Sequence, residues 1–240
     1  MTNKMDSITP FCSKNSHSGA DVRRLNDIWC KNGYYIPLIY PLIQLATGDS
    51  FLATIIALKT FPANYWYWYE TEYDYLPRGY NWIKQFVRFT DTGHIASALV
   101  YASPQYIPVA FTTHFLITVG YWGSIIWFDL KDLDDKHLRD LDPLFIKLWC
   151  TFNHSVPLLF LLYKVREECV PFTYDQWVNS YLWMYTWFFC VYTPWRLVTK
   201  DPVYSVLSFG VPIKKACIFV GFVHAVISVG FLLGYFLSRC

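Results

Sequence analysis

The chain has 240 residues, of which 54% are hydrophobic and 20% aromatic, whereas only 16% are charged. A typical soluble domain is about 25% charged. This composition excludes a disordered chain, a collagen-like repeat and a disulfide-stapled mini-protein, and it argues against an ordinary soluble domain. The formal net charge of +2 is too small to indicate a nucleic-acid-binding surface, so we expect no nucleic-acid partner.

Long apolar blocks are the main evidence for the fold. A helix needs about 20 largely apolar residues to cross a hydrocarbon core of about 30 Å. Candidate spans lie at residues 35–58, 86–104, 106–128, 144–163, 174–192 and 217–237. We therefore predict an all-α fold, a polytopic transmembrane helix bundle of about six spans over residues 34–240, preceded by a polar N-terminal segment at residues 1–33. A five-span bundle is the alternative, because prolines and the Gly48-Asp49 pair interrupt the first block.

The connections between these blocks fit a membrane protein. Residues 62–82 are dense in Trp and Tyr, which favour the headgroup zone of a bilayer. Residues 129–142 form the strongly charged run of the chain and must lie in water. Residues 193–215 carry prolines and lysines and are predicted to form an interfacial loop. With six spans, lysines and arginines are divided almost evenly between the two sides of the membrane, so their distribution does not fix the orientation. The basic residues before the first span favour a cytosolic N-terminus.

The sequence gives no sign of a signal peptide, a lipid anchor or a metal site. No apolar stretch closely follows the basic residues near the N-terminus, and Thr2 stands where N-myristoylation requires a glycine. The seven cysteines lack zinc-site spacing. Cys150, Cys190 and Cys217 lie within or at the edge of apolar blocks, where we expect them to be small apolar fillers, and we expect no metal and no cofactor.

Polar groups inside the predicted spans are the candidates for function. An ionisable side chain at bilayer depth costs about 2.5 to 3.5 kcal/mol, so it persists where it pairs, lines a cavity or does chemistry. The polar groups of this kind are Arg88, Thr90, Asp91, Thr92, His94, His114, Asn153, His154 and His224. On a helix, Arg88 and Asp91 lie three residues apart and could neutralise each other, whereas Thr90 and His94 share another face.

His154 has the most informative surroundings of the histidines. Asn153 and Ser155 flank it, and Pro157 follows, where a proline can kink the helix and open room for water or substrate. Histidine is the natural general base because its unperturbed pKa of about 6.5 lies near operating pH. The structural alternative is a histidine that is hydrogen-bonded between helices, and it applies still more to His114 and His224.

Two short stretches carry a resemblance to a known family. The stretch FVRFTDTGH at residues 86–94 resembles the F-x-x-[LF]-T-x-x-[GN] element of the androgen-induced membrane proteins, which are multi-pass hydrolases of fatty acid esters of hydroxy fatty acids. The stretch FNHSVP at residues 152–157 is similar to the family's N-H or H-x-x-P element, and the similarity in hydropathy order covers residues 35–237. The resemblance implies that Thr90 is the nucleophile and His154 the base. Aligning the chain on the aspartate of vertebrate members would instead place Arg88 at the nucleophile position, and Pro157 stands where those members have a second histidine.

The residues and the resemblance together predict a threonine-type hydrolase of lipid esters, embedded in the endoplasmic reticulum membrane or, alternatively, the plasma membrane. Its partners would be membrane lipids and the ester substrate, and its oligomeric state is open. Asn153 or Ser155 could donate to the developing oxyanion, and Arg88 could hold the free carboxylate of the substrate. Two other functions stay open. One is a non-catalytic scaffold or lipid-binding protein in which the histidines join helices. The other is a small transporter with Arg88, Asp91 and His94 as a relay.

Overall fold

The computed structural model describes residues 48–49, 51, 53, 87–128, 143–199, 203–204 and 212–239. All regular structure within these ranges is helical, so the all-α prediction is confirmed for this part of the chain. The N-terminal segment, the aromatic connection at 62–82, the charged run at 129–142 and nearly all of the first predicted span lie outside the described residues.

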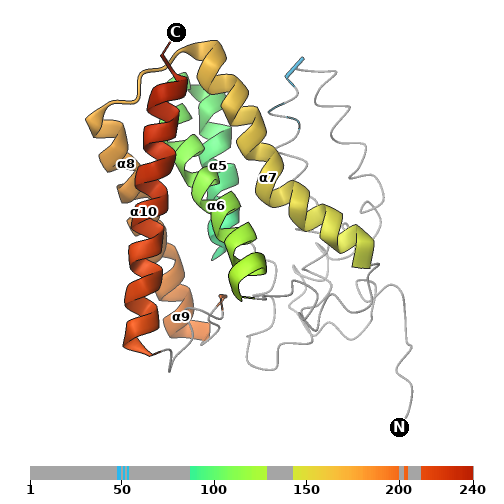
Figure 1. Ribbon diagram of the computed structural model, residues 1–240, viewed down its shortest axis with the longest axis vertical. Coiled ribbons are helices and arrows are strands. Elements are labelled where there is room, and N and C mark those ends of the chain that lie inside the picture. The colour runs from blue at the N-terminus through green and yellow to red at the C-terminus, as the bar shows by residue number, and fades with distance from the viewer. Residues whose placement is uncertain are drawn as a thin grey trace, which may run out of the picture.

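The described helices form a bundle around one central helix (Figure 1). In chain order they are α5 (Phe89–Ala102), the short 3₁₀ helix η3 (Pro104–Tyr106), α6 (Ile107–Phe128), α7 (Pro143–Glu168), α8 (Tyr174–Thr186), the π-helix η6 (Trp187–Tyr192), α9 (Thr193–Thr199) and α10 (Ile213–Leu237). The helix α6 is the centre, because it packs against α5, α7, α8 and α10.

The helix α5 is shorter than the predicted span at 86–104. It has 14 residues, so at about 1.5 Å per residue it is about 21 Å long, less than the thickness of a hydrocarbon core. It ends at Ser103, whose backbone is extended, and Pro104 follows. The backbone is also extended at Arg88, just before the helix begins. Hydropathy alone overestimates the length of this helix, because the extended residues Arg88 and Ser103 do not change the apolar character of the block.

The helix α7 is longer than its predicted span at 144–163. It has 26 residues and continues through Pro157. Beyond the apolar block, the Lys164 ammonium lies 2.7 Å from a carboxylate oxygen of Glu167 and 3.6 Å from one of Glu168. The hydrogen bond to Glu167 raises the pKa of Lys164 above its usual value. The two glutamates of this cluster are exposed, so the C-terminal end of α7 continues as a polar, solvent-accessible turn beyond its apolar block.

The predicted interfacial loop at 193–215 is wrong for its first part, because α8, η6 and α9 form one continuous helical segment over residues 174–199. The segment starts with a capping box, in which the Thr173 N–H donates to the Gln176 side chain at 2.9 Å. At its π-helical turn, the Thr193 hydroxyl donates to the Phe188 carbonyl, five residues back, at 2.7 Å. This wider turn lets the chain pass Pro194, which lacks the N–H that an α-helix needs.

The helix α10 packs closely on its neighbours through two glycines four residues apart. It starts at Ile213, earlier than the predicted 217, and has 25 residues. A Cβ added at Gly230 would lie 2.6 Å from the Phe115 ring, and one added at Gly234 would overlap the Phe172 ring. Spacing of small residues at i and i+4 lets helices approach closely in membranes.

Several outward surfaces of the bundle are apolar. Within the described segments, α10 is the one helix long and apolar enough to cross a membrane, judged by length and composition. Large apolar side chains are nevertheless exposed on the other long helices as well. Examples are Ile126 on α6, Leu159 and Tyr163 on α7, Leu182 on α8, and Ile218, Val229 and Phe236 on α10.

Candidate functional site

The candidate site is built around a break in the helical chain at Arg88. Val87 and Phe89 are both helical, whereas Arg88 between them has an extended backbone with φ −65° and ψ 138°. The helix α5 therefore begins at this break. The first turn of a helix presents N–H groups and the positive end of the helix dipole, which favour a negatively charged group nearby.

The break lies at mid-length of the bundle. The rings of His94 on α5 and His114 on α6 stack with 5.6 Å between their centroids, and a Cβ at Gly93 would lie 3.2 Å from His114. The two helices are antiparallel, since only the short η3 turn joins them. The step of one turn from His94 back to Thr90 on α5 therefore corresponds to the step of one turn from His114 forward to Thr118 on α6. Thr90 thus lies at the same level as Thr118, near the middle of α6.

A tyrosine from a distant part of the sequence lies beside Thr90 at the break. The Thr90 side chain is buried, with 7% of its surface exposed. The Tyr204 hydroxyl accepts the Phe89 N–H at 2.8 Å, and the Thr90 side chain is close enough to act on the Tyr204 phenol. Tyr204 lies in the connection between α9 and α10, and burial raises its pKa to about 12. Its hydroxyl therefore keeps its proton at neutral pH.

A tryptophan of the π-helix η6 completes the surroundings of the break. The Trp187 indole N–H donates to the Val87 carbonyl at 2.7 Å, which satisfies a backbone group just before the break. Its ring packs edge-on against Phe89, with 5.0 Å between centroids, and against Tyr204, with 6.3 Å. Single π-helical turns occur frequently at functional sites. Three segments far apart in the sequence thus converge on the start of α5.

His154 lies in the middle of α7 with a defined ring orientation. Its Nδ1 is 2.7 Å from the Cys150 carbonyl oxygen, which can only accept a hydrogen bond. In the neutral ring Nδ1 must therefore carry the proton, and Nε2 keeps the lone pair that a base needs. The ring stacks on Tyr121 with 4.1 Å between centroids, and the Thr118 hydroxyl donates to the His154 carbonyl. His154 is therefore level with Thr118, as Thr90 is.

The other predicted site residues fall into the same two groups. Arg88 is at the break beside Thr90 and acts electrostatically on Tyr204. Asn153 is buried, and the Ser155 hydroxyl accepts a hydrogen bond from the Trp122 indole at 3.0 Å. The structure thus brings Arg88 and Thr90 together on α5, and Asn153, His154 and Ser155 together on α7. The contacts given above join Thr90 and His154 to other residues, so a direct contact between them stays a prediction.

A buried cluster of ionisable groups begins directly after Thr90 on α5 and continues across to α6. Asp91, His94 and His114 are all buried. The sequence suggested Arg88 as the neighbour of Asp91, and the structure adds His94, whose Nδ1 lies 4.0 Å from an Asp91 carboxylate oxygen. Of the imidazoles, His114 is also close enough to His154 for their charges to interact. Polar groups on three helices therefore gather around the central part of α6.

No family model, curated protein or solved structure matches this chain. The resemblance to the androgen-induced membrane proteins therefore stays a prediction, and the candidate site depends on its own geometry. No group of three or more His, Cys, Asp or Glu side chains within the described ranges could hold a metal ion.

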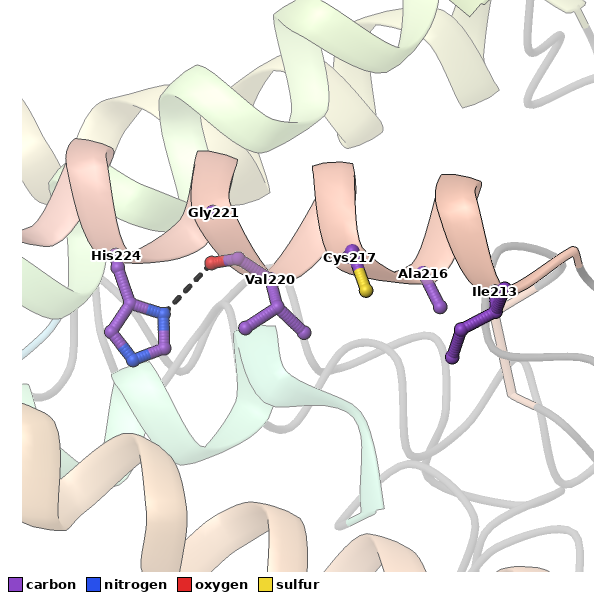
Figure 2. A pocket seen from close by; sticks show the side chains of 6 residues that line it. All are labelled: Ile213, Ala216, Cys217, Val220, Gly221 and His224. Carbon is purple, nitrogen blue, oxygen red and sulfur yellow. Dashed lines mark hydrogen bonds between the residues drawn. The ribbon is translucent and has the colours of Figure 1, made fainter.

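His224 serves a structural contact at the edge of an apolar hollow. Its Nδ1 lies 2.8 Å from the Val220 carbonyl, and its Nε2 lies 2.6 Å from the Tyr185 hydroxyl on α8. Figure 2 shows that it ends a row of side chains along one face of α10. The residues of this row line a hollow of about 560 Å³. They are Ile213, Ala216, Cys217, Val220, Gly221 and His224. This geometry fits the interhelical alternative that the sequence left open for His224.

Sequence reasoning missed Trp187 and Tyr204 as parts of the site. Trp187 is one of many aromatic residues in an apolar block, and Tyr204 falls in the predicted interfacial loop at 193–215. The partners of these residues lie 100 and 115 positions away along the chain. The available signal for Tyr204 was the Pro202-Val203-Tyr204 turn, which resembles a turn of the same family.

Proposed function

We propose that this chain is a multi-pass membrane protein of about six spans that hydrolyses lipid esters, with Thr90 as nucleophile and His154 as base. Fatty acid esters of hydroxy fatty acids are the substrate class that the resemblance suggests. We further propose the endoplasmic reticulum membrane as its location, with the plasma membrane as the alternative.

The membrane part of this proposal is supported by composition and by surface chemistry. The chain has few charges and long apolar blocks, and α10 is a candidate span. Residues such as Leu159 on α7 and Ile218 and Phe236 on α10 are more than half exposed. Lipid chains would cover these side chains, whereas water would leave a large apolar surface exposed.

The observation that carries the catalytic part is the common level of Thr90 and His154 along α6. Thr90 is level with Thr118, and the Thr118 hydroxyl contacts the backbone of His154. The helix break at Arg88 lies at this same depth. Broken helices at membrane depth are tolerated where they are buried in protein or line a cavity, and in transporters they form substrate sites.

The reaction would proceed by acyl transfer to Thr90. The Nε2 atom of His154 takes the hydroxyl proton as the Thr90 oxygen forms a bond to the ester carbonyl carbon, and the bond from that carbon to the alcohol oxygen then breaks. The alcohol leaves with the proton from His154. Water, deprotonated by His154, next attacks the acyl carbon. The bond from that carbon to the Thr90 oxygen breaks, the fatty acid is released, and His154 returns the proton to the Thr90 oxygen. Arg88 and the positive end of α5 would hold a substrate carboxylate, and Asn153 or Ser155 would donate to the oxyanion.

A matched pair of threonine variants tests the nucleophile. Thr90 and Thr92 are both buried in the first turn of α5, but the Thr92 hydroxyl donates to the Phe89 carbonyl at 2.7 Å. In purified protein in nanodiscs, Thr90→Ala should lower kcat for ester hydrolysis by about 10³-fold or more. Thr92→Ala should stay within a few-fold of the wild type. A Thr90→Ala protein with full activity would remove the nucleophile assignment.

A non-catalytic membrane scaffold or lipid-binding protein is the second candidate, and a specific observation favours it. The contacts given above for His154, Ser155 and His224 include bonds or ring stacking to other helices. These are the contacts expected of polar side chains that hold a membrane bundle together. Under this alternative, the wild-type protein would not turn over esters, and Thr90→Ala would leave lipid binding unchanged.

A further inference from the structure

We propose that Tyr204 is a further catalytic residue, whose hydroxyl donates a hydrogen bond to the oxyanion that develops when Thr90 attacks an ester carbonyl. This inference rests on the proposed function and adds a donor that lies outside all six predicted spans. Removing one oxyanion donor from a hydrolase typically lowers kcat by about 10² to 10³-fold.

The hydrogen bond from Phe89 places the Tyr204 hydroxyl beside Thr90 and leaves its proton for another acceptor. The phenol oxygen accepts the Phe89 N–H at 2.8 Å, and Phe89 directly precedes Thr90. The Thr90 side chain is close enough to act on the Tyr204 phenol. When the Thr90 oxygen bonds to the carbonyl carbon of the substrate, the oxyanion forms on the oxygen attached to that carbon. This oxyanion would lie within reach of the Tyr204 hydroxyl.

The backbone before Tyr204 is held in a conformation that is unfavourable for its residue type. Val203 has φ 58°, in the left-handed region, where a β-branched side chain is rare. Its side chain packs with Val87 and Trp195 beside the helix break. Strained backbone held by its surroundings clusters at functional sites, where it fixes the position of a side chain. The edge-on contact with Trp187 restricts the Tyr204 ring further.

The electrostatic surroundings suit a neutral donor. Burial raises the pKa of Tyr204 to about 12, so the phenol is protonated over the working range of a hydrolase. An O–H donor to a charged oxygen forms one of the stronger hydrogen bonds in proteins. The positive end of α5 lies at the same place and would stabilise the same negative charge.

Tyr204→Phe tests the donor because it removes the hydroxyl and keeps the ring against Trp187. Tyr181→Phe is the matched control, since the Tyr181 hydroxyl bonds the His224 carbonyl at 3.0 Å, away from the helix break. With a p-nitrophenyl ester in nanodiscs, Tyr204→Phe should lower kcat by about 10² to 10³-fold and leave KM within about two-fold, since the donor acts in the transition state. Tyr181→Phe should keep the wild-type kcat.

The outcomes separate this inference from the proposed function. If the wild type hydrolyses the ester through Thr90 and Tyr204→Phe keeps the wild-type kcat, the donor role of Tyr204 is overturned and the hydrolase proposal stands. If the wild type neither hydrolyses the ester nor reacts at Thr90 with an alkyl fluorophosphonate, both fall together.

A second variant covers the case in which Tyr204→Phe does not fold, because Phe89 would lose its acceptor. Incorporation of 3-fluorotyrosine at position 204 keeps the hydroxyl and makes it more acidic. A deprotonated phenol cannot donate, so kcat should fall at a lower pH in this variant than in the wild type. If kcat falls at the same alkaline pH in this variant and in the wild type, the inference is overturned.

Discussion

At the scale of single residues, Thr90 differs from Thr92, Thr112 and Thr199 in the surroundings of its side chain. The hydroxyls of Thr92, Thr112 and Thr199 donate to carbonyls three or four residues earlier at 2.7, 2.7 and 2.8 Å, the usual inert arrangement of threonine in a helix. Thr90 instead lies beside the Tyr204 hydroxyl at the positive end of α5. That end stabilises negative charge, so an alkoxide forms there at a lower free-energy cost than elsewhere.

Arg88 gives a prediction that depends on the chemistry of the substrate. If its guanidinium holds the free carboxylate of the ester, Arg88→Gln loses a charge-assisted hydrogen bond of about 1.5 to 3 kcal/mol. KM for a carboxylated substrate should then rise by about 10 to 100-fold. KM for the methyl ester of the same substrate should stay unchanged, which serves as the control. An equal effect on both substrates would show that Arg88 supports the fold and does not bind the carboxylate.

The sequence could name some of these residues and not others, for a physical reason. Arg88, Thr90 and His154 stood out because ionisable or polar groups in apolar blocks are costly and therefore few. Tyr204 and Trp187 did not, because the chain is 20% aromatic and one more aromatic residue carries little information. Their role comes from long-range contacts that neither periodicity nor composition reveals.

At the scale of the elements, hydropathy located the described helices but not their ends. The helix α6 follows the predicted block at 106–128 closely. The break at Arg88 and the π-helical turn at 187–192 change hydrogen bonding without changing apolar character. For this reason the predicted boundaries failed at α5 and after α8, and both failures adjoin the candidate site.

The packing of α10 on α6 yields a prediction about stability. Gly230 has the Phe115 ring 2.6 Å from where its Cβ would be, whereas Gly221, also on α10, has nothing within 4 Å. Gly230→Val should therefore force α10 from α6 and lower the free energy of unfolding in detergent by about 1 to 3 kcal/mol. Gly221→Val should change it by less than about 0.5 kcal/mol. Equal effects of the two substitutions would contradict this packing.

At the scale of the whole molecule, the bundle combines an apolar exterior with polar groups at its centre. Figure 1 shows the C-terminal ends of α7 and α10 at the same end of the bundle, where Lys164, Glu167 and Arg239 lie. Lys214 and Lys215 lie at the opposite end of α10. The buried groups Thr90, His94 and His114 lie between these two charged ends. A lipid ester could enter this region sideways and keep its acyl chains in apolar surroundings.

The most direct test of the central claim is the position of a covalent adduct. The wild-type protein in nanodiscs is treated with an alkyl fluorophosphonate, and the modified peptide is identified by mass spectrometry. We predict an adduct on Thr90 that forms about 10³-fold more slowly in His154→Gln, because the threonine hydroxyl needs its base. An adduct on another residue, the absence of any adduct, or an undiminished rate in His154→Gln would contradict the account.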